Sequence, residues 1–142
     1  LYYEESLTFE VDNYKKASIL YKIAVKFKTR GLKTKSRQYA RKALKFQPSM
    51  GKAYLLIANL YASSANDCGE TQFEKRSIYW LAAQQARKAA NVDPSTKKTA
   101  LSMAKSYEGR APTRTDIFTE GKEGQTIIFS CWIKDKITVP KL

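Results

Sequence analysis

The chain has 142 residues, a mass of 16.2 kDa and a formal net charge of +13, from 26 Lys and Arg against 13 Asp and Glu. Because it contains no His, the sequence excludes His-based acid–base catalysis, Ser-His or Cys-His nucleophile pairs and His-containing metal sites. Its two Cys cannot complete a four-ligand zinc site alone, and no apolar run approaches the roughly 20 residues of a membrane-spanning helix. We therefore expect no metal, no cofactor and no transmembrane segment.

The N-terminal segment predicts the end of a helical unit. Residues 2–11, YYEESLTFEV, have the pattern of a second helix whose partner helix is absent. The chain begins at Leu1 without an initiator Met or an apolar signal segment, so we interpret it as a fragment of a longer or processed protein. Residues 1–11 are then a partial unit, and the next helix should begin near Asp12 or Asn13.

Residues 12–48 predict two helices joined by a turn at Gly31. The first helix has a large apolar residue, then Ala, then an aromatic residue, at Ile23, Ala24 and Phe27. The second helix has small residues at helical spacing and ends at a proline: Ser36, Ala40, Ala43 and Pro48. Ala leaves room for two helices to cross closely, while the aromatic side chain fills the gap to the next helix. Pro cannot continue a helix, because it lacks an amide hydrogen.

Residues 49–94 repeat both motifs. The first motif recurs at Ile57, Ala58 and Tyr61, at an offset of 34 residues from the first unit. The second motif, ARKALKFQP, recurs as ARKAANVDP at an offset of 46 residues, and the same offset separates Ile57 from Met103. The second unit therefore contains 12 extra residues between its two helices.

The insertion precedes the second helix of this unit. We assign it to residues 63–74 and expect it to protrude as a loop. Thr71 and Glu74 have the spacing of a capping box, which predicts a long helix over residues 72–90. A weaker copy of the first motif follows in residues 95–109 and predicts a capping helix.

The two motifs resemble the tetratricopeptide repeat (TPR), a helix-turn-helix unit of about 34 residues whose copies stack into an α-solenoid. The resemblance covers residues 1–109 and implies an all-α, TPR-like helical array whose first helices line a concave groove. Such a groove suits an extended peptide or a helix of another protein that carries acidic and apolar groups. The residues expected to face it are Ser18, Tyr21, Val25, Lys28, Lys52, Leu55, Asn59, Lys98, Leu101 and Lys105. For each of them, a solvated helix face is the alternative.

Residues 110–142 leave the repeat and predict a tail with a β-hairpin. Pro and Gly residues interrupt the chain around a short helical turn at residues 116–120. Two β-rich segments, residues 126–133 and 137–140, flank an expected turn at residues 134–136. A lone hairpin is marginally stable in water, so we expect it to pack on the last helices or to pair with another chain.

The NDCG insertion, the KSY of the last repeat and the CWI…TV ending resemble uncharacterised TPR proteins of the Bacteroidota that are usually assigned to the cell envelope. The resemblance implies export to the periplasm or cell envelope, which a disulfide between Cys68 and Cys131 would suit. A cytoplasmic location is the alternative. Both Cys lie outside the repeats, so a bridge would tie the tail to the insertion; two unrelated buried thiols are the alternative.

The net charge is concentrated in the first half of the array. Residues 13–66 contain 13 Lys and Arg and no carboxylate. The densest part is a basic patch: Lys26, Lys28, Arg30, Lys33, Lys35, Arg37, Arg41, Lys42 and Lys45. An anionic partner explains such a run of like charges, and an ordinary helix surface is the alternative. One such partner is RNA, bound through residues 13–52, because Arg37 and Arg41 offer phosphate contacts and Tyr39 offers stacking.

No catalytic arrangement is evident in the sequence. The carboxylates Glu4, Glu5, Glu10 and Asp12 cluster near the start, but their pattern matches a helix surface, without a glycine-rich phosphate loop or metal-ligand spacing. The sequence therefore predicts a non-catalytic scaffold or adaptor, a subunit of a bacterial envelope complex that binds a protein partner through its groove and its basic half. An RNA-binding helical-repeat protein is the alternative.

Overall fold

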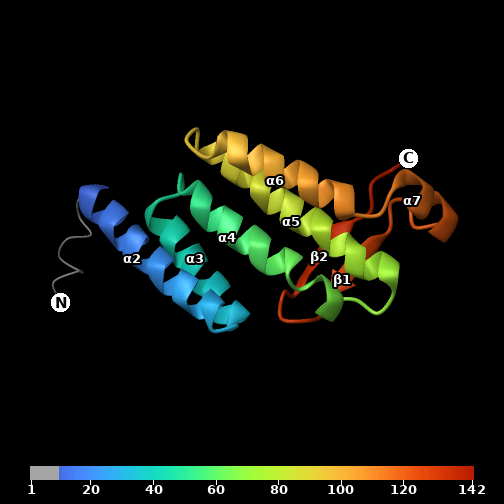
Figure 1. The fold of residues 1–142 in the computed structure, drawn as a ribbon, viewed down its shortest axis with the longest axis horizontal. Helices are drawn as coiled ribbons and strands as arrows, with labels where there is room; N and C mark the ends of the chain where they lie inside the picture. Colours follow the sequence, from blue (N-terminus) through green and yellow to red (C-terminus); the bar gives the residue numbers. More distant parts are fainter. Residues whose placement is uncertain (1–9) are drawn as a thin grey trace.

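The computed structural model describes residues 10–142, which form a row of helices followed by a small two-stranded sheet (Figure 1). The helices of the row are α2 (Glu10–Thr29), α3 (Lys33–Phe46), α4 (Gly51–Ala62), α5 (Gln72–Val92) and α6 (Lys97–Arg110). Each helix packs on the next one in sequence, and α4 also contacts both α2 and α6. Helices α2, α4 and α6 therefore lie beside one another on one face of the row.

The first helix begins earlier than the sequence predicts. Helix α2 already includes Glu10 and Val11, whereas its expected start is near Asp12 or Asn13. No Gly or Pro directly precedes Asp12 and Asn13, so nothing in the local sequence prevents the helix from starting before them. The remainder of the expected partial unit, residues 1–9, lies outside the described residues.

The small residues of both motifs lie where the helices pack. Ala24, Ala58 and Ala104 are completely buried in α2, α4 and α6, as their spacing predicts. The small residues of the second helices are also completely buried: Ser36, Ala40, Ala43, Ala82, Ala86 and Ala89. The Ser36 hydroxyl donates to the backbone carbonyl of Ala24 at 2.7 Å, which satisfies this buried polar group and ties α3 to α2.

Gly51 marks a close approach between the start of α4 and the turn that joins α5 to α6. Its amide donates to Asp93 Oδ2 at 3.0 Å. A Cβ atom on Gly51 would touch the Thr96 hydroxyl and lie 2.7 Å from Asp93 Cβ. Hydrogen bonds, chiefly from the Ser95 hydroxyl, hold the pKa of the Asp93 carboxyl below its ordinary value, so the acceptor for Gly51 stays charged.

Replacing Gly51 by Ala should lower the free energy of unfolding by about 1–3 kcal/mol, because the added methyl group has no space. Gly109 is the matched control, since it lies in α6 and a Cβ atom there would meet nothing within 4 Å. Gly109→Ala should leave stability unchanged or raise it by up to about 1 kcal/mol, because Ala is the better helix former. Denaturant titrations measure the free energy of unfolding of the three proteins. Equal values for Gly51→Ala and the wild type would show that the turn at residues 93–96 moves to accept the methyl group at little cost.

The insertion packs against the row, so the expectation that it protrudes is wrong. It forms a short 3-10 turn, η1 (Ala65–Asp67), next to the buried residues Ser64 and Cys68. The predicted capping box is confirmed: the Thr71 hydroxyl accepts from the Glu74 amide, and the Glu74 carboxylate accepts from the Thr71 amide. Helix α5 begins directly behind this box.

The tail contains helix α7 (Arg114–Glu120) and strands β1 (Thr126–Phe129) and β2 (Asp135–Thr138), which pair antiparallel. The hairpin is confirmed, but its turn is not at residues 134–136. Phe129 pairs with Asp135, so residues 130–134 form the loop. Lys134 has a left-handed φ of 48°, and its amide donates to the carbonyl of Cys131 at 3.1 Å, so the chain turns within this loop.

The hairpin packs on the helices, which is one of the two expected outcomes. The buried residues are Ile127 and Phe129 of β1, Ile137 of β2, and Val139, which directly follows β2. They join the main hydrophobic core, and β2 contacts α5. A two-stranded sheet that is marginal by itself is thus stabilised by burial of one face.

Candidate functional site

The residues predicted to line a groove lie on the three neighbouring helices α2, α4 and α6. Exposed members are Val25, Lys28, Lys52, Asn59, Lys98 and Lys105, and half-buried members are Ser18, Tyr21, Leu55 and Leu101. Lys52 Nζ lies 4.7 Å from the ring centroid of Tyr21, and burial raises the pKa of that tyrosine. Leu55 on α4 and Leu101 on α6 pack against the same buried cluster of alanines. The helices thus bring parts of this predicted set together across helix boundaries.

This face carries lysines without carboxylate partners. The chain has no Asp or Glu from residue 13 to residue 66, and none in α6 before Glu108. Glu108 pairs with Arg87 of α5 at 2.7 Å. Within residues 10–142 the other ion pair joins Arg76 to Asp116, so the lysines of the α2–α4–α6 face are left uncompensated there. Uncompensated cations of this kind attract an anionic partner.

The basic patch divides into structural and exposed residues. Three of its members bond inside the protein: Lys33, Arg37 and Arg41. Lys33 Nζ donates to the Ser64 hydroxyl at 2.9 Å, and Arg41 donates to the Tyr61 hydroxyl at 3.4 Å. The exposed members are Lys26, Lys28, Arg30, Lys35, Lys42 and Lys45, some of which lie against aromatic rings of α2 or α3.

Arg37 on α3 holds the hairpin loop against the helices. Its guanidinium donates to the backbone carbonyls of Ile133 at 2.7 Å and Trp132 at 3.2 Å, and to the Tyr61 hydroxyl at 3.1 Å. It also lies 4.8 Å from the Trp132 ring centroid, and the Trp132 indole donates to the Ser64 hydroxyl at 2.9 Å. The sequence gives no signal for this role, because the partners are 95 and 96 residues away.

Cys68 and Cys131 form a disulfide, with Cα atoms 5.4 Å apart. This confirms the predicted pairing, and the alternative of two free thiols is wrong. The bridge joins the insertion to the hairpin loop that Arg37 and Ser64 also hold. Three independent contacts therefore fix the loop to α3 and the insertion.

Arg37→Lys should loosen the hairpin loop, because Lys keeps the charge but cannot bridge two carbonyls and stack on Trp132 with the same group. We expect the free energy that holds the hairpin against the helices to fall by about 2 kcal/mol, a typical contribution of hydrogen bonds to a charged group. Hydrogen exchange should then be faster at residues 126–139 and unchanged in α4. Arg41→Lys is the matched control, since Arg41 makes a single long hydrogen bond to the Tyr61 hydroxyl and none to the hairpin loop. Equal exchange rates at residues 126–139 in the two variants would show that Arg37 does not hold the loop.

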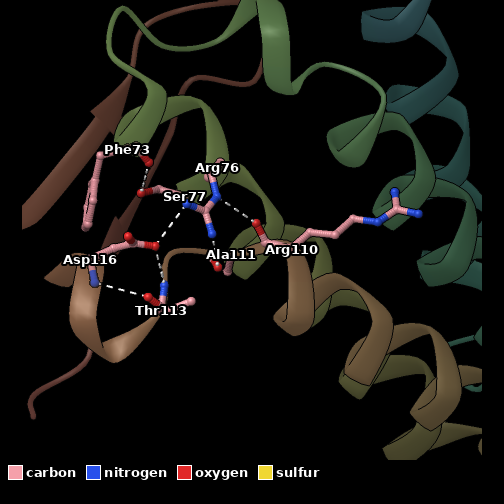
Figure 2. A network of polar contacts seen from close by, with 7 residues as sticks. All are labelled: Phe73, Arg76, Ser77, Arg110, Ala111, Thr113 and Asp116. Atoms are coloured by element: carbon pink, nitrogen blue, oxygen red, sulfur yellow. Dashed lines mark hydrogen bonds and ion pairs between the residues drawn. The ribbon is translucent and has the colours of Figure 1, made fainter.

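A second arginine, Arg76 on α5, holds the start of the tail (Figure 2). It donates to the carbonyls of Arg110 at 3.2 Å and Ala111 at 3.1 Å, and to Asp116 Oδ2 at 2.9 Å. Asp116 also forms a capping box with Thr113 at the start of α7. Hydrogen bonds from Thr113, then the charge of Arg76, hold the pKa of the Asp116 carboxyl below its ordinary value. Arg76 therefore joins α5, the end of α6 and α7.

The described residues contain no group of three or more Cys, Asp or Glu that is placed to hold a metal ion. Glu4 and Glu5 of the acidic cluster lie outside residues 10–142. None of the helices in that range combines the length and the hydrophobicity required to span a bilayer. No protein-family model, curated protein or solved structure matches the chain.

Proposed function

We propose that this chain is a non-catalytic, TPR-type scaffold that binds another protein across the α2–α4–α6 face. The observation that carries the proposal is the composition of this face, where half-buried leucines and uncompensated lysines lie on three neighbouring helices. Such a surface suits a helix or an extended segment of a partner. The completely buried alanines, which recur at offsets of 34 and 46 residues, support the TPR-type arrangement.

The disulfide supports a role in the periplasm or cell envelope. Disulfides persist in oxidising compartments and are rare where thiols are kept reduced. In such a compartment the disulfide keeps the tail attached to the insertion, which stabilises the scaffold. We propose that the chain works there as a subunit of a larger envelope complex.

RNA binding is the second candidate, and the exposed lysines of the basic patch favour it. Two of the residues expected to contact RNA are engaged inside the protein. Arg37 bonds to the hairpin loop, and Tyr39 packs 5.3 Å from the Phe27 ring beneath Lys42 Nζ, which lies 4.6 Å from its centroid. These contacts favour the protein-binding proposal.

Affinity purification from the native source, with crosslinks mapped by mass spectrometry, tests the proposal. The groove variant combines Lys52→Ala with Leu101→Ala, and the matched outer variant combines Lys42→Ala with Lys45→Ala on α3. We expect a partner that crosslinks to α4 or α6 and is lost only with the groove variant. The RNA candidate would prevail if no protein is retained and single-stranded RNA binds tightly, with steep weakening between about 50 and about 200 mM salt.

A further inference from the structure

Two contacts set the register of α4 against α6. The Gly51 amide, at the start of α4, bonds to Asp93 just before α6, and Leu55 and Leu101, each about one turn into its helix, pack on the same buried cluster. The two helices therefore run in the same direction. From these fixed points, each helix advances about 1.5 Å per residue, so residues at matched distances along the two helices lie side by side.

The matched positions form an apolar row between two polar rows. Leu55 lies at the level of Leu101, and both pack with Tyr54 around the buried Ala89, Ala90 and Ala100. One turn before them lie Lys52 and Lys98, and one turn after them lie Asn59 and Lys105. All four residues of the flanking rows are exposed.

Helix α2 extends this pattern. The Lys52 ammonium lies over the Tyr21 ring, and the offset of 34 residues between the first two units relates Tyr21 to Leu55. One turn further along α2 is Val25, with 38% of its surface exposed, and the next turn carries the exposed Lys28. Lysines are thus present on both sides of an apolar strip, and no carboxylate on these segments neutralises them.

We infer that the partner of this face is an acidic protein segment with an apolar centre, whose carboxylates lie on both sides of the side chain that contacts Leu55 and Leu101. This inference rests on the protein-binding function proposed above. Lys98 and Lys105 are separated by two helical turns, about 10 Å. A segment in the polyproline II conformation along α6 covers that distance in about three residues and presents every third side chain to the same face. The expected ligand pattern is therefore acidic, apolar, apolar, acidic.

Synthetic fluorescein-labelled peptides test this pattern by fluorescence anisotropy. The acidic probe is GDEFLDEG, its neutral counterpart is GNQFLNQG, and GDEGSDEG keeps the charge without the apolar centre. We expect the acidic probe to bind about tenfold more tightly than either counterpart, because each lacks one of the two contacts. Lys98→Gln combined with Lys105→Gln should weaken its binding by about tenfold. The same charge change at Lys42 and Lys45 on α3 should have less than about a twofold effect.

The inference is overturned if no probe binds, if affinity follows probe charge alone, or if both double variants lose affinity equally. Its failure is distinguishable from failure of the proposed function. If the inference alone fails, a natural partner crosslinks to α4 or α6 and binds the Lys98→Gln and Lys105→Gln double variant as tightly as the wild type. This result would support the protein-binding proposal and exclude the acidic pattern.

Discussion

Ala58→Arg should lower the free energy of unfolding by about 3 kcal/mol or more, enough to unfold much of the helical row. Ala58 is completely buried in α4, which packs on α3 and α5 and also contacts α2 and α6. A long charged side chain at this position must either push these helices apart or lose its hydration in the core. Both outcomes destabilise the folded state.

Gln84→Arg on α5 is the matched control, because it adds the same side chain and charge at an exposed position. Thermal unfolding followed by circular dichroism compares the two variants with the wild type. We expect the control to melt with the wild type and Ala58→Arg to melt far below it or to be unfolded at the start. Identical melting of all three proteins would mean that Ala58 is not at a helix crossing.

Loss of the disulfide should have the second large effect. The bridge joins residues separated by 63 positions, and closure of a loop of this length stabilises the folded state by about 4 kcal/mol in the chain-entropy model. Reduction of the wild type, or Cys68→Ser combined with Cys131→Ser, should therefore lower the denaturant midpoint strongly. The hairpin loop should also exchange its amide hydrogens faster, since it would keep its noncovalent contacts but lose its covalent link to the insertion.

The double Cys variant supplies the control, because reductant should leave its unfolding curve unchanged. Intact mass after alkylation, with and without reductant, reports the redox state of each sample. Two alkylatable thiols in the untreated protein would contradict the bridge. An unchanged midpoint after complete reduction would contradict its stabilising role.

The parts of the fold that could be predicted from sequence depend on local patterns. Ala24 and Ala58 lie in repeated motifs, so their burial follows from helical periodicity and spacing. The capping box of Thr71 and Glu74 is a contact across three residues and was equally visible. The β-rich composition of two segments in the tail indicated a hairpin, and the structure has strands β1 and β2 there.

The parts that could not be predicted depend on contacts between distant segments. Arg37 looked like any other cation of a basic helix, because the carbonyls that it bonds belong to the tail. The insertion looked like a polar loop, yet Ser64 is buried there, and its hydroxyl accepts hydrogen bonds from the distant residues Lys33 and Trp132. The hairpin loop at residues 130–134 makes these contacts, whereas the sequence predicted a turn at residues 134–136.

Site-specific photo-crosslinking in the native source tests the central claim most directly. A photoreactive amino acid is placed at Val25 or Lys105 on the α2–α4–α6 face, and at Gln38 or Gln84 on α3 and α5, all of which are exposed. The proposed function predicts one protein partner that is captured from Val25 and Lys105 and not from Gln38 or Gln84. Capture from Gln38 and Gln84 alone, or no capture from the α2–α4–α6 face, would contradict it.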